Sequence, residues 1–278
     1  MTDHELQLKA VGLRRAMLQL IVNAGAGHTG GGLSCIDILN VLYNRVLNVS
    51  PETFGDPTRD RYVQSKGHSV EALYAVLADR GLFPASALDT VCRYRSPFVG
   101  HPTRKISGIE MNTGALGHGL PISVGLALAA KMDQAGYRVF TLLGDGELAE
   151  GSNWEAAMAA AHYRLDNLTA ILDHNSLQIT GRTREVCNNE PLDAKYRAFG
   201  WEVSTVNGHD ISELTAVLSQ PPRKGQPTCI IANTVKGQGV SFMEDVARWH
   251  HRVPTEQELR QALAELDAAE AKLKATAL

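Results

Sequence analysis

The sequence predicts an α/β protein with a mainly parallel sheet and helices on both faces. Short apolar runs at 139–143 and 168–172 are separated by a segment of helical spacing, which is the pattern of a βαβ unit. The chain has 278 residues, 44% of them hydrophobic, so it can bury a large core. No internal repeat or shift in composition marks a boundary, and we therefore expect a single domain over residues 1–278.

The first expected elements are mostly helical. Apolar residues recur at helical spacing over 4–24, and a glycine-rich break separates this helix from a second one at 34–46. Ser34 is the expected N-cap of that second helix, because serine commonly caps a helix N-terminus. A short strand at 61–64 then leads into a helix at 70–80.

The second half of the chain alternates between helix and strand, as a parallel sheet requires. Before it, residues 93–119 contain glycines, prolines and few periodic apolar positions, so we expect one long functional loop. Thr255 and Glu258 form a capping-box pair that predicts an amphipathic C-terminal helix at about 255–275. Between them we expect helices at 121–135, 153–163, 193–199 and 211–218, and strands at 139–143, 168–173, 201–206 and 229–234.

Charge and composition exclude several classes of function. The formal net charge of −3 gives no reason to expect a nucleic-acid or anionic-membrane partner. No window approaches the roughly 18 apolar residues of a membrane span, and the acidic N-terminus does not resemble a signal peptide, so we expect a cytoplasmic protein. No Cys-x-x-Cys pair occurs, and we expect buried or inert thiols rather than a zinc site or disulfides at Cys35, Cys92, Cys187 and Cys229.

Polar residues follow the two central apolar runs. Gly144-Asp145-Gly146-Glu147 comes after the first run, and Asn175 after the second. Because ligands collect outside the carboxyl ends of parallel strands, Asp145 and Asn175 can converge on one ion. A carboxylate and an amide oxygen suit Mg²⁺ together with a ligand phosphate, and glycines let the backbone approach that phosphate closely.

A simple turn is the alternative explanation of Gly-Asp-Gly, since these residues dominate turns. The second strand, which ends at Asn175, favours the metal and phosphate site. Another motif, Gly25 to Gly30, satisfies the dinucleotide pattern Gly-x-Gly-x-x-Gly. We reject an NAD site there, because a helix precedes the motif and residues 48–50 lack the acidic residue that should follow it.

Four histidines lie in small-residue or motif settings: His28, His68, His101 and His250. Imidazole can exchange protons with sugar hydroxyls and carbonyls near neutral pH. Taken singly, each is better explained as a structural or solvated side chain. We expect the latter for His118, His162, His174 and His209.

The stretch at 144–151, with 173–179 downstream, resembles the cofactor motif of thiamine diphosphate enzymes and, among them, of transketolases. The resemblance covers essentially the whole chain. Its further motifs, in transketolase order, are GHTG at 27–30, SKGH at 65–68, GHP at 100–102, TGALGHG at 113–119 and KGQG at 236–239.

This resemblance implies a thiamine diphosphate-binding fold of the diphosphate-binding type, with thiamine diphosphate and Mg²⁺, or Ca²⁺, as cofactors. It implies metal ligation by Asp145, Asn175 and the backbone carbonyl of Leu177. The residues implied in cofactor binding are His68, Gly114, Leu116, Gly144, Asp145, Gly146, Glu147, Asn175 and Ile179.

The catalytic residues are implied in the same way. His28, His68, His101 and His250 are similar to the family's substrate-channel histidines, which bind sugar hydroxyls and assist proton transfer. Glu150 matches the glutamate that links two active sites across the dimer. Where the family often has His-Gly, this chain has His250-His251, and we assign the role to His250.

Full-length transketolases carry three domains, and this chain resembles only the first. The resemblance therefore implies the cofactor-binding subunit of a split transketolase, inactive alone, whose partner supplies the pyrimidine-binding and C-terminal domains in an A₂B₂ assembly. The complete enzyme would transfer a two-carbon ketol unit from a ketose, or its phosphate, to an aldose.

Other functions stay open at this point. The chain could be the α subunit of a 2-oxoacid dehydrogenase, a deoxyxylulose phosphate synthase, or a non-catalytic cofactor-binding protein. A transketolase for a sulfonated or branched sugar would look much the same in this half.

Overall fold

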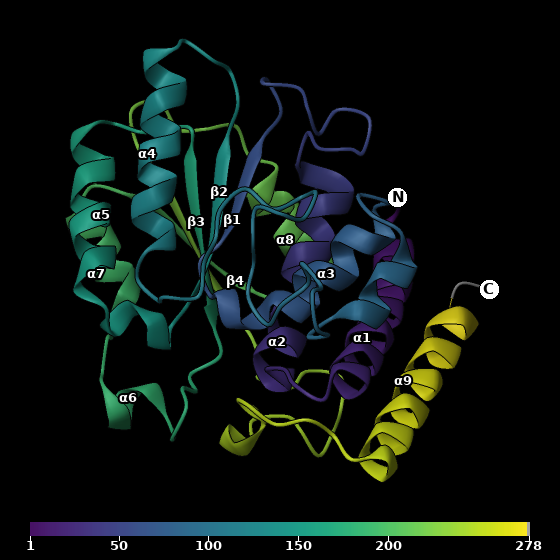
Figure 1. The fold of residues 1–278 in the computed structure, drawn as a ribbon. Coiled ribbons are helices and arrows are strands. Elements are labelled where there is room, and N and C mark those ends of the chain that lie inside the picture. The colour runs from purple at the N-terminus through teal and green to yellow at the C-terminus, as the bar shows by residue number, and fades with distance from the viewer. Residues whose placement is uncertain (277–278) are drawn as a thin grey trace.

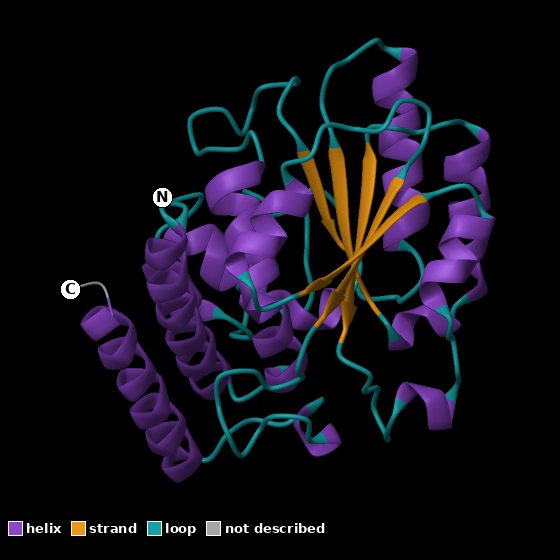
Figure 2. Ribbon diagram, turned by 180° about the vertical axis from the view of Figure 1, so that it is seen from behind, coloured by secondary structure: helices purple, strands orange, loops and turns teal. Residues whose placement is uncertain are grey.

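The computed structural model describes residues 1–276 and contains a five-stranded, wholly parallel sheet. The strand order is β1-β2-β3-β5-β4 (Figure 2). This confirms the predicted α/β class. The strands are β1 Arg61–Gln64, β2 Val139–Gly144, β3 Leu168–His174, β4 Glu202–Asn207 and β5 Thr228–Asn233.

Helices cover both faces of the sheet (Figure 1). One face carries α4 Gly119–Met132, α5 Gly151–His162 and α7 Leu192–Ala198. The other carries α1 Asp3–Ala24, α2 Thr29–Val41, α3 Val70–Asp79 and α8 Ile211–Leu218, and α9 Glu256–Thr276 packs on α1. No helix within residues 1–276 has the length and apolarity needed to cross a membrane.

The central strands are apolar throughout because both of their faces are covered. In β2, Phe140 and Leu142 belong to the core beneath α1, α2 and α3, whereas Val139 and Leu143 belong to the core beneath α4 and α5. Successive side chains point to opposite faces of a strand, so a strand buried on both sides reads as a continuous apolar run.

The prediction for the second helix was wrong at its start. Helix α2 begins at Thr29, includes the glycines that were expected to break the chain, and passes into a π-helical turn at Leu42–Val46. Ser34 is therefore inside the helix and does not cap it; its hydroxyl donates to Asp173 Oδ2 at 2.6 Å. Gly32 is in the helix for close packing, since a Cβ there would lie 2.6 Å from Met17 Sδ.

The C-terminal helix has the predicted capping box. Glu258 N donates to Thr255 Oγ1 at 3.2 Å, and Thr255 N donates to the Glu258 carboxylate at 2.9 Å. Helix α6, Thr183–Val186, was not predicted. Within 93–118 the structure has neither helix nor strand, in agreement with the predicted long loop.

The cysteines agree only in part with expectation. Cys35 and Cys229 are buried, and burial raises the pKa of the Cys35 thiol to about 11. Cys92 and Cys187 are exposed, so burial, one of the two expected alternatives, does not apply to them. They lie in loops outside the sheet, where no strand or helix face directs a side chain inward.

Candidate active site

Segments that follow the carboxyl ends of β1, β2, β3 and β5 surround a cavity of about 380 Å³. This is the edge at which ligands of open α/β sheets bind. Residues expected from the sequence supply much of its wall: His68, Leu116, Gly144, Asp145, Gly146, Glu147, Glu150, Asn175, Leu177, Ile179 and His250. His28, His101 and Gly114 do not line this cavity and lie beside it.

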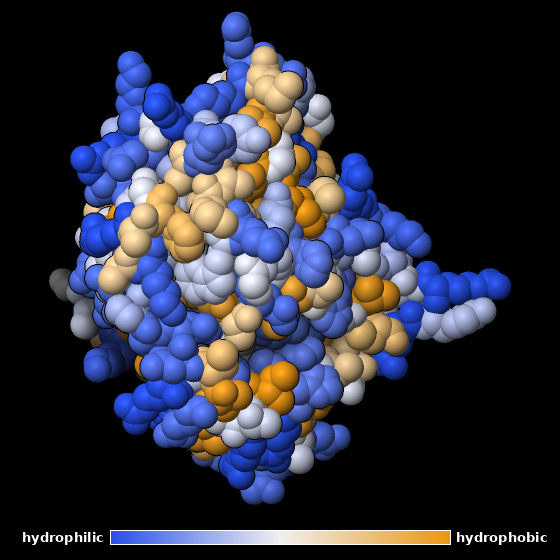
Figure 3. All heavy atoms as spheres, turned by 90° about the vertical axis from the view of Figure 1, so that its left-hand side faces the viewer, coloured by the Kyte–Doolittle hydropathy of each residue, from blue (hydrophilic) through white to orange (hydrophobic). Residues whose placement is uncertain are grey.

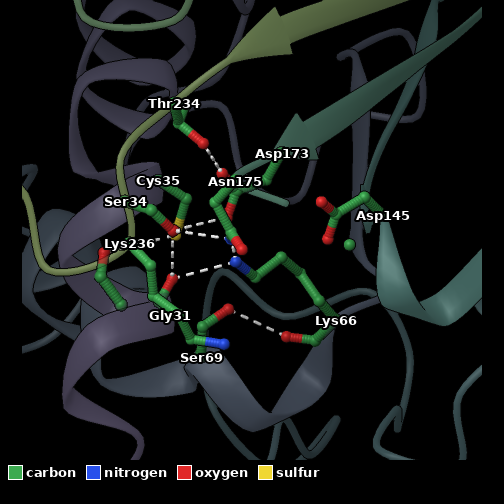
Figure 4. Close-up of polar contacts among 12 residues, drawn as sticks. Gly31, Ser34, Cys35, Lys66, Ser69, Asp145, Asp173, Asn175, Thr234 and Lys236 are labelled. Carbon is green, nitrogen blue, oxygen red and sulfur yellow. Dashed lines mark hydrogen bonds and ion pairs between the residues drawn. The ribbon is translucent and has the colours of Figure 1, made fainter. Parts of the chain in front are cut away.

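Asp145 and Asn175 are brought to this cavity from neighbouring strands. The Asp145 carboxylate accepts hydrogen bonds from the backbone N–H groups of Gly146 and Ser176, at 2.8 and 2.5 Å. Asn175 Oδ1 accepts from Leu177 N at 3.1 Å. In Figure 4 the Asp145 carboxylate faces the side on which Asn175 lies.

The electrostatic setting of Asp145 suits a cation. Burial and the negative charge of Asp173 raise the pKa of the Asp145 carboxyl above its usual value. A bound divalent cation would offset both effects, because it stabilises the ionised carboxylate. The donor set of carboxylate, amide and carbonyl oxygens is the one that Mg²⁺ and Ca²⁺ prefer, so the residues present fit such an ion.

The Glu147 carboxyl holds three segments near the cavity together by hydrogen bonds. This buried carboxyl accepts from Gly117 N and Gly144 N, each at 3.0 Å, and from the hydroxyl of Ser65. Burial raises the pKa of this carboxyl. Three segments far apart in sequence are thus tied to one side chain, which is a positioning role rather than an evident contact with a ligand.

Two buried lysines were not singled out by sequence reasoning. Lys66 Nζ donates to Gly31 O at 2.9 Å and pairs with Asp173. Lys236 Nζ donates to Leu177 O at 3.1 Å and lies 2.9 Å from His250 Nδ1. Burial and the nearby Lys66 charge lower the pKa of Lys236 to about 8. Both lysines occur in motifs that carried the family resemblance, SKGH and KGQG. These motifs could therefore have identified them as site residues from the sequence.

The predicted histidines form one cluster. The ring centre of His28 lies 5.2 Å from that of His68, 6.2 Å from that of His101 and 5.6 Å from that of His250. His28 also lies 4.6 Å from His251, so both members of the His250-His251 pair reach the cluster. Only His250 lines the cavity, whereas His251 is exposed.

The imidazoles of His28, His68, His101 and His250 are neutral at pH 7, because the pKa of each lies below its usual value. Burial and the neighbouring positive groups lower the pKa of His28 to about 4 and that of His250 to about 3. Burial also lowers the pKa of His68 and of His101. A neutral imidazole has one N–H donor and one acceptor nitrogen, which suits hydrogen bonding to hydroxyl groups.

Gly114 and Gly67 allow two loops to touch beside this cluster. Gly114 has φ +137°, and a Cβ there would lie 2.5 Å from the His101 ring. A Cβ on Gly67 would lie 2.7 Å from Gly114 N. The close approach therefore requires glycine at both positions.

Two further predicted residues are largely exposed. Ile179 has 69% of its surface exposed, and the exposed Glu150 precedes the first turn of α5. Val186, 46% exposed, lines the same cavity as Ile179, and adjoining exposed apolar side chains are typical of a surface that another molecule covers.

The remaining histidines have structural or exposed positions, as expected. His174 Nδ1 lies 2.8 Å from Asn233 Oδ1, His118 is exposed, and His162 packs edge-on against Tyr163. His209 bridges Asp37 and Val235.

The parallel sheet and the cavity at the carboxyl ends of its strands define a cofactor-binding α/β domain. The model of the family "Transketolase, thiamine diphosphate binding domain" matches residues 7–272. The chain belongs to this transketolase family. The match favours transketolase chemistry over the NAD-dependent and 2-oxoacid dehydrogenase alternatives.

Similar proteins include chains that are named as transketolase subunits. The chain is 44% identical over 270 residues to one such subunit, that of the apulose-4-phosphate transketolase of Phocaeicola vulgatus, covering 97% of this chain and 96% of that one. It is 44% identical over 265 residues to the 6-deoxy-6-sulfo-D-fructose transketolase subunit SqwG of a Clostridium species, with 95% and 96% covered.

Similarity to longer transketolases is confined to part of their length. Human transketolase is 40% identical over 239 residues, which are 86% of this chain but 38% of the human protein. The solved transketolase structure from Campylobacter jejuni matches with a TM-score of 0.84 and 31% identity, covering 99% of this chain and 48% of that one.

Proposed function

We propose that this chain is the cofactor-binding subunit of a two-chain transketolase and that it acts only with a second subunit. The observation that carries the proposal is coverage: the chain spans 96% of a relative that is named as a transketolase subunit, but 38% of human transketolase. The second subunit would supply the pyrimidine-binding and C-terminal domains. We propose that residues 1–278 act as one thiamine diphosphate-binding unit.

Thiamine diphosphate would occupy the cavity with a divalent cation, Mg²⁺ or Ca²⁺. We assign the cation to Asp145, Asn175 and the Leu177 carbonyl, and the diphosphate to the backbone around Gly144 and Gly146. Lys236, whose ammonium group reaches the Leu177 carbonyl, would face the same diphosphate. When bound, thiamine diphosphate supplies the carbanion chemistry that moves a two-carbon unit.

The histidine cluster would bind the sugar. His28, His68, His101 and His250 would donate to and accept from hydroxyl groups of the ketose, because their lowered pKa values keep each imidazole neutral at pH 7. Such contacts orient the reacting carbon and move protons to or from hydroxyl oxygens.

The sugar would carry an anionic group. The two relatives described above are named for apulose-4-phosphate and for 6-deoxy-6-sulfo-D-fructose, a phosphate and a sulfonate. We extend this class to the present chain: a phosphorylated or sulfonated ketose as donor and an aldose as acceptor, with the pentose phosphates as one member of the class.

We propose an A₂B₂ assembly, in the cytoplasm. Apolar side chains are exposed on the face of α4 and α5, where Met132 is 76% and Met158 56% exposed (Figure 3). Exposed apolar residues on this face and at Ile179 would be covered by other subunits. Glu150 would lie at the contact between two active sites.

Two-carbon transfer from xylulose 5-phosphate to ribose 5-phosphate tests the function. The assay contains thiamine diphosphate and Mg²⁺, and compares this chain alone with the chain plus its second subunit. We expect activity only in the mixture. If the pentose phosphates are inactive, the branched and sulfonated ketoses are tested next; a cofactor-loaded complex inactive with all of them would contradict the proposal.

A further inference from the structure

The segment after β5 carries Lys236 into the cavity, but its own backbone is not part of the sheet. Gly237 has φ +87°, and a Cβ there would lie 2.3 Å from Met243 O, so the chain turns sharply and in close contact. Gly237 N donates to Gly30 O at 3.0 Å. The position of the Lys236 ammonium group therefore depends on what holds the residues on either side of it.

A buried network holds those residues. Arg14 from α1 donates two hydrogen bonds to the Asp37 carboxylate of α2, at 3.0 and 2.6 Å. His209, which follows β4, lies with Nδ1 2.8 Å from Asp37 Oδ2. The two outer ends of the network reach the Lys236 segment: Val235 N donates to His209 Nε2 at 2.8 Å, and Arg14 Nε donates to Gln238 O at 3.1 Å.

The hydrogen bonds determine the tautomer of His209. A backbone N–H can only donate, so His209 Nε2 must accept from Val235, and the ring proton must be on Nδ1, where it is donated to Asp37. Loss of either hydrogen bond, to Asp37 or from Val235, would free the His209 ring from one of its two neighbours. The ring thus transmits the position of Asp37 directly to the residue before Lys236.

The ion pair at the centre is rigid because it is buried. The Arg14 and Asp37 side chains are each 7% exposed. Burial opposes ionisation of Asp37, but the Arg14 charge and the hydrogen bonds from His209 and Arg14 hold its pKa at about 2. A fully paired, buried network of this kind restrains its members more than surface contacts do.

A role in filling the core does not explain where the network of Arg14, Asp37 and His209 makes its contacts. The network contacts the segment at 235 and at 238, one residue before Lys236 and two after it, through main-chain atoms. Arg14 also packs against Gly239, where a Cβ would lie 3.0 Å from Arg14 Cδ. The contacts therefore hold the backbone of this segment in place without touching the Lys236 side chain.

We propose that Arg14, Asp37 and His209 are positioning residues that hold Lys236 in the cavity and thereby set the affinity of the site for a diphosphate. The proposal rests on the proposed function, which makes thiamine diphosphate that ligand. The network acts on cofactor binding, and it reaches a sugar-binding histidine only through Lys236, whose Nζ lies 2.9 Å from His250 Nδ1.

Calorimetric titration of the two-subunit complex with thiamine diphosphate at saturating Mg²⁺ tests the proposal. We expect Lys236→Met to raise Kd at least tenfold and His209→Ala to raise it about fivefold to twentyfold. The double variant should bind no more weakly than Lys236→Met alone, because the network acts through that lysine. His209→Gln, whose amide oxygen can accept from Val235, should recover most of the affinity.

Asp60→Asn is the matched control. Asp60 is a buried carboxylate paired with Arg138 at 2.7 Å, and it precedes β1 at the opposite edge of the sheet. The Asp60→Asn variant should lower the Tm of the complex and leave its Kd for thiamine diphosphate unchanged. If His209→Ala does not yield folded protein, Asp37→Asn takes its place in the same cycle.

The outcomes separate the two proposals. If the wild-type complex does not bind thiamine diphosphate, the proposed function fails and the inference fails with it. If Lys236→Met leaves Kd unchanged, the lysine does not face the diphosphate and the inference is overturned while the transketolase function stands. Two results would show that the inference alone is wrong. In the first, Lys236→Met raises Kd but His209→Ala does not. In the second, the double variant binds more weakly than Lys236→Met alone, so the two substitutions act independently.

Discussion

Lys66 and Asp173 form an ion pair whose side chains are 1% and 0% exposed, at the carboxyl end of β3. Ser34, Thr234 and Asn175 also donate to the Asp173 carboxylate (Figure 4). The pair lowers the pKa of Asp173 and raises that of Lys66, in each case against the effect of burial. Asn175 Nδ2 contacts Asp173 Oδ2 at 3.3 Å, so the amide oxygen, which accepts one hydrogen bond from Leu177 N, keeps a second lone pair for a cation.

Lys66→Met should destabilise the protein by about 3–5 kcal/mol, because it leaves a buried carboxylate without its counter-charge. The double variant Lys66→Met, Asp173→Asn should lose less than the single one, since no unpaired charge remains. Urea denaturation of the cofactor-free chain measures both. Equal losses in the single and double variants would show that the charge pairing is not what matters.

Asp145→Ala should abolish thiamine diphosphate binding without destabilising the cofactor-free chain. Burial and Asp173 raise the pKa of this carboxyl, so its removal relieves an unfavourable interaction while it deletes a proposed metal ligand. Calorimetry with Mg²⁺ and thermal unfolding of the free chain provide the two readouts. Normal cofactor affinity in the variant would contradict the metal assignment.

Glu71→Gln should change the dependence of stability on pH. Burial raises the pKa of Glu71 to about 8, and Glu71 Oε2 has no hydrogen-bond partner. The unfolded chain loses this proton near pH 4.5 and the folded chain near 8, so the wild type loses stability as pH rises between them. The difference in the free energy of unfolding, variant minus wild type, should increase by on the order of 3 kcal/mol from pH 5 to pH 8. Urea denaturation at several pH values checks this, and a constant difference would rule it out.

Gly114→Ala should destabilise the chain by about 1–3 kcal/mol and lower activity, because φ is +137° and the new Cβ would meet the His101 ring at 2.5 Å. Gly125→Ala is the control: it lies in α4 with no atom within 4 Å of its Cβ, and should stabilise by roughly 0.5–1 kcal/mol. Thermal unfolding and the transfer assay compare them. A harmless Gly114→Ala would argue against the close contact.

His101→Ala should reduce kcat/KM for the ketose by roughly tenfold to hundredfold, while the Kd for thiamine diphosphate stays the same. The reason is position: His101 belongs to the histidine cluster but does not line the diphosphate cavity. His162→Ala, at the end of α5 and away from the cluster, should affect neither quantity. If His101→Ala also raised the Kd for thiamine diphosphate, His101 would contact the cofactor and not only the sugar.

Sequence reasoning succeeded where the signal is local. The strands predicted at 139–143 and 168–173 are found at 139–144 and 168–174, because both faces are buried and nearly every position is apolar. The capping box at Thr255 and Glu258 is likewise a contact between near neighbours. Sequence reasoning failed at the start of α2. Glycine was taken as a helix breaker there, but Gly32 lies in the helix because Met17 occupies the space of a side chain.

The sequence by itself determined the α/β class, the order of the strands along the chain, and the placement of Asp145 and Asn175 at one edge of the sheet, since these follow from local pattern and from the rule that ligands bind at strand ends. Only the tertiary structure decided which groups meet: His28 with His250, Lys66 with Asp173, and His209 between Asp37 and Val235. These partners are far apart in the chain, and their tautomers and pKa values depend on burial and neighbouring charge, which arise only when the helices and the sheet pack together.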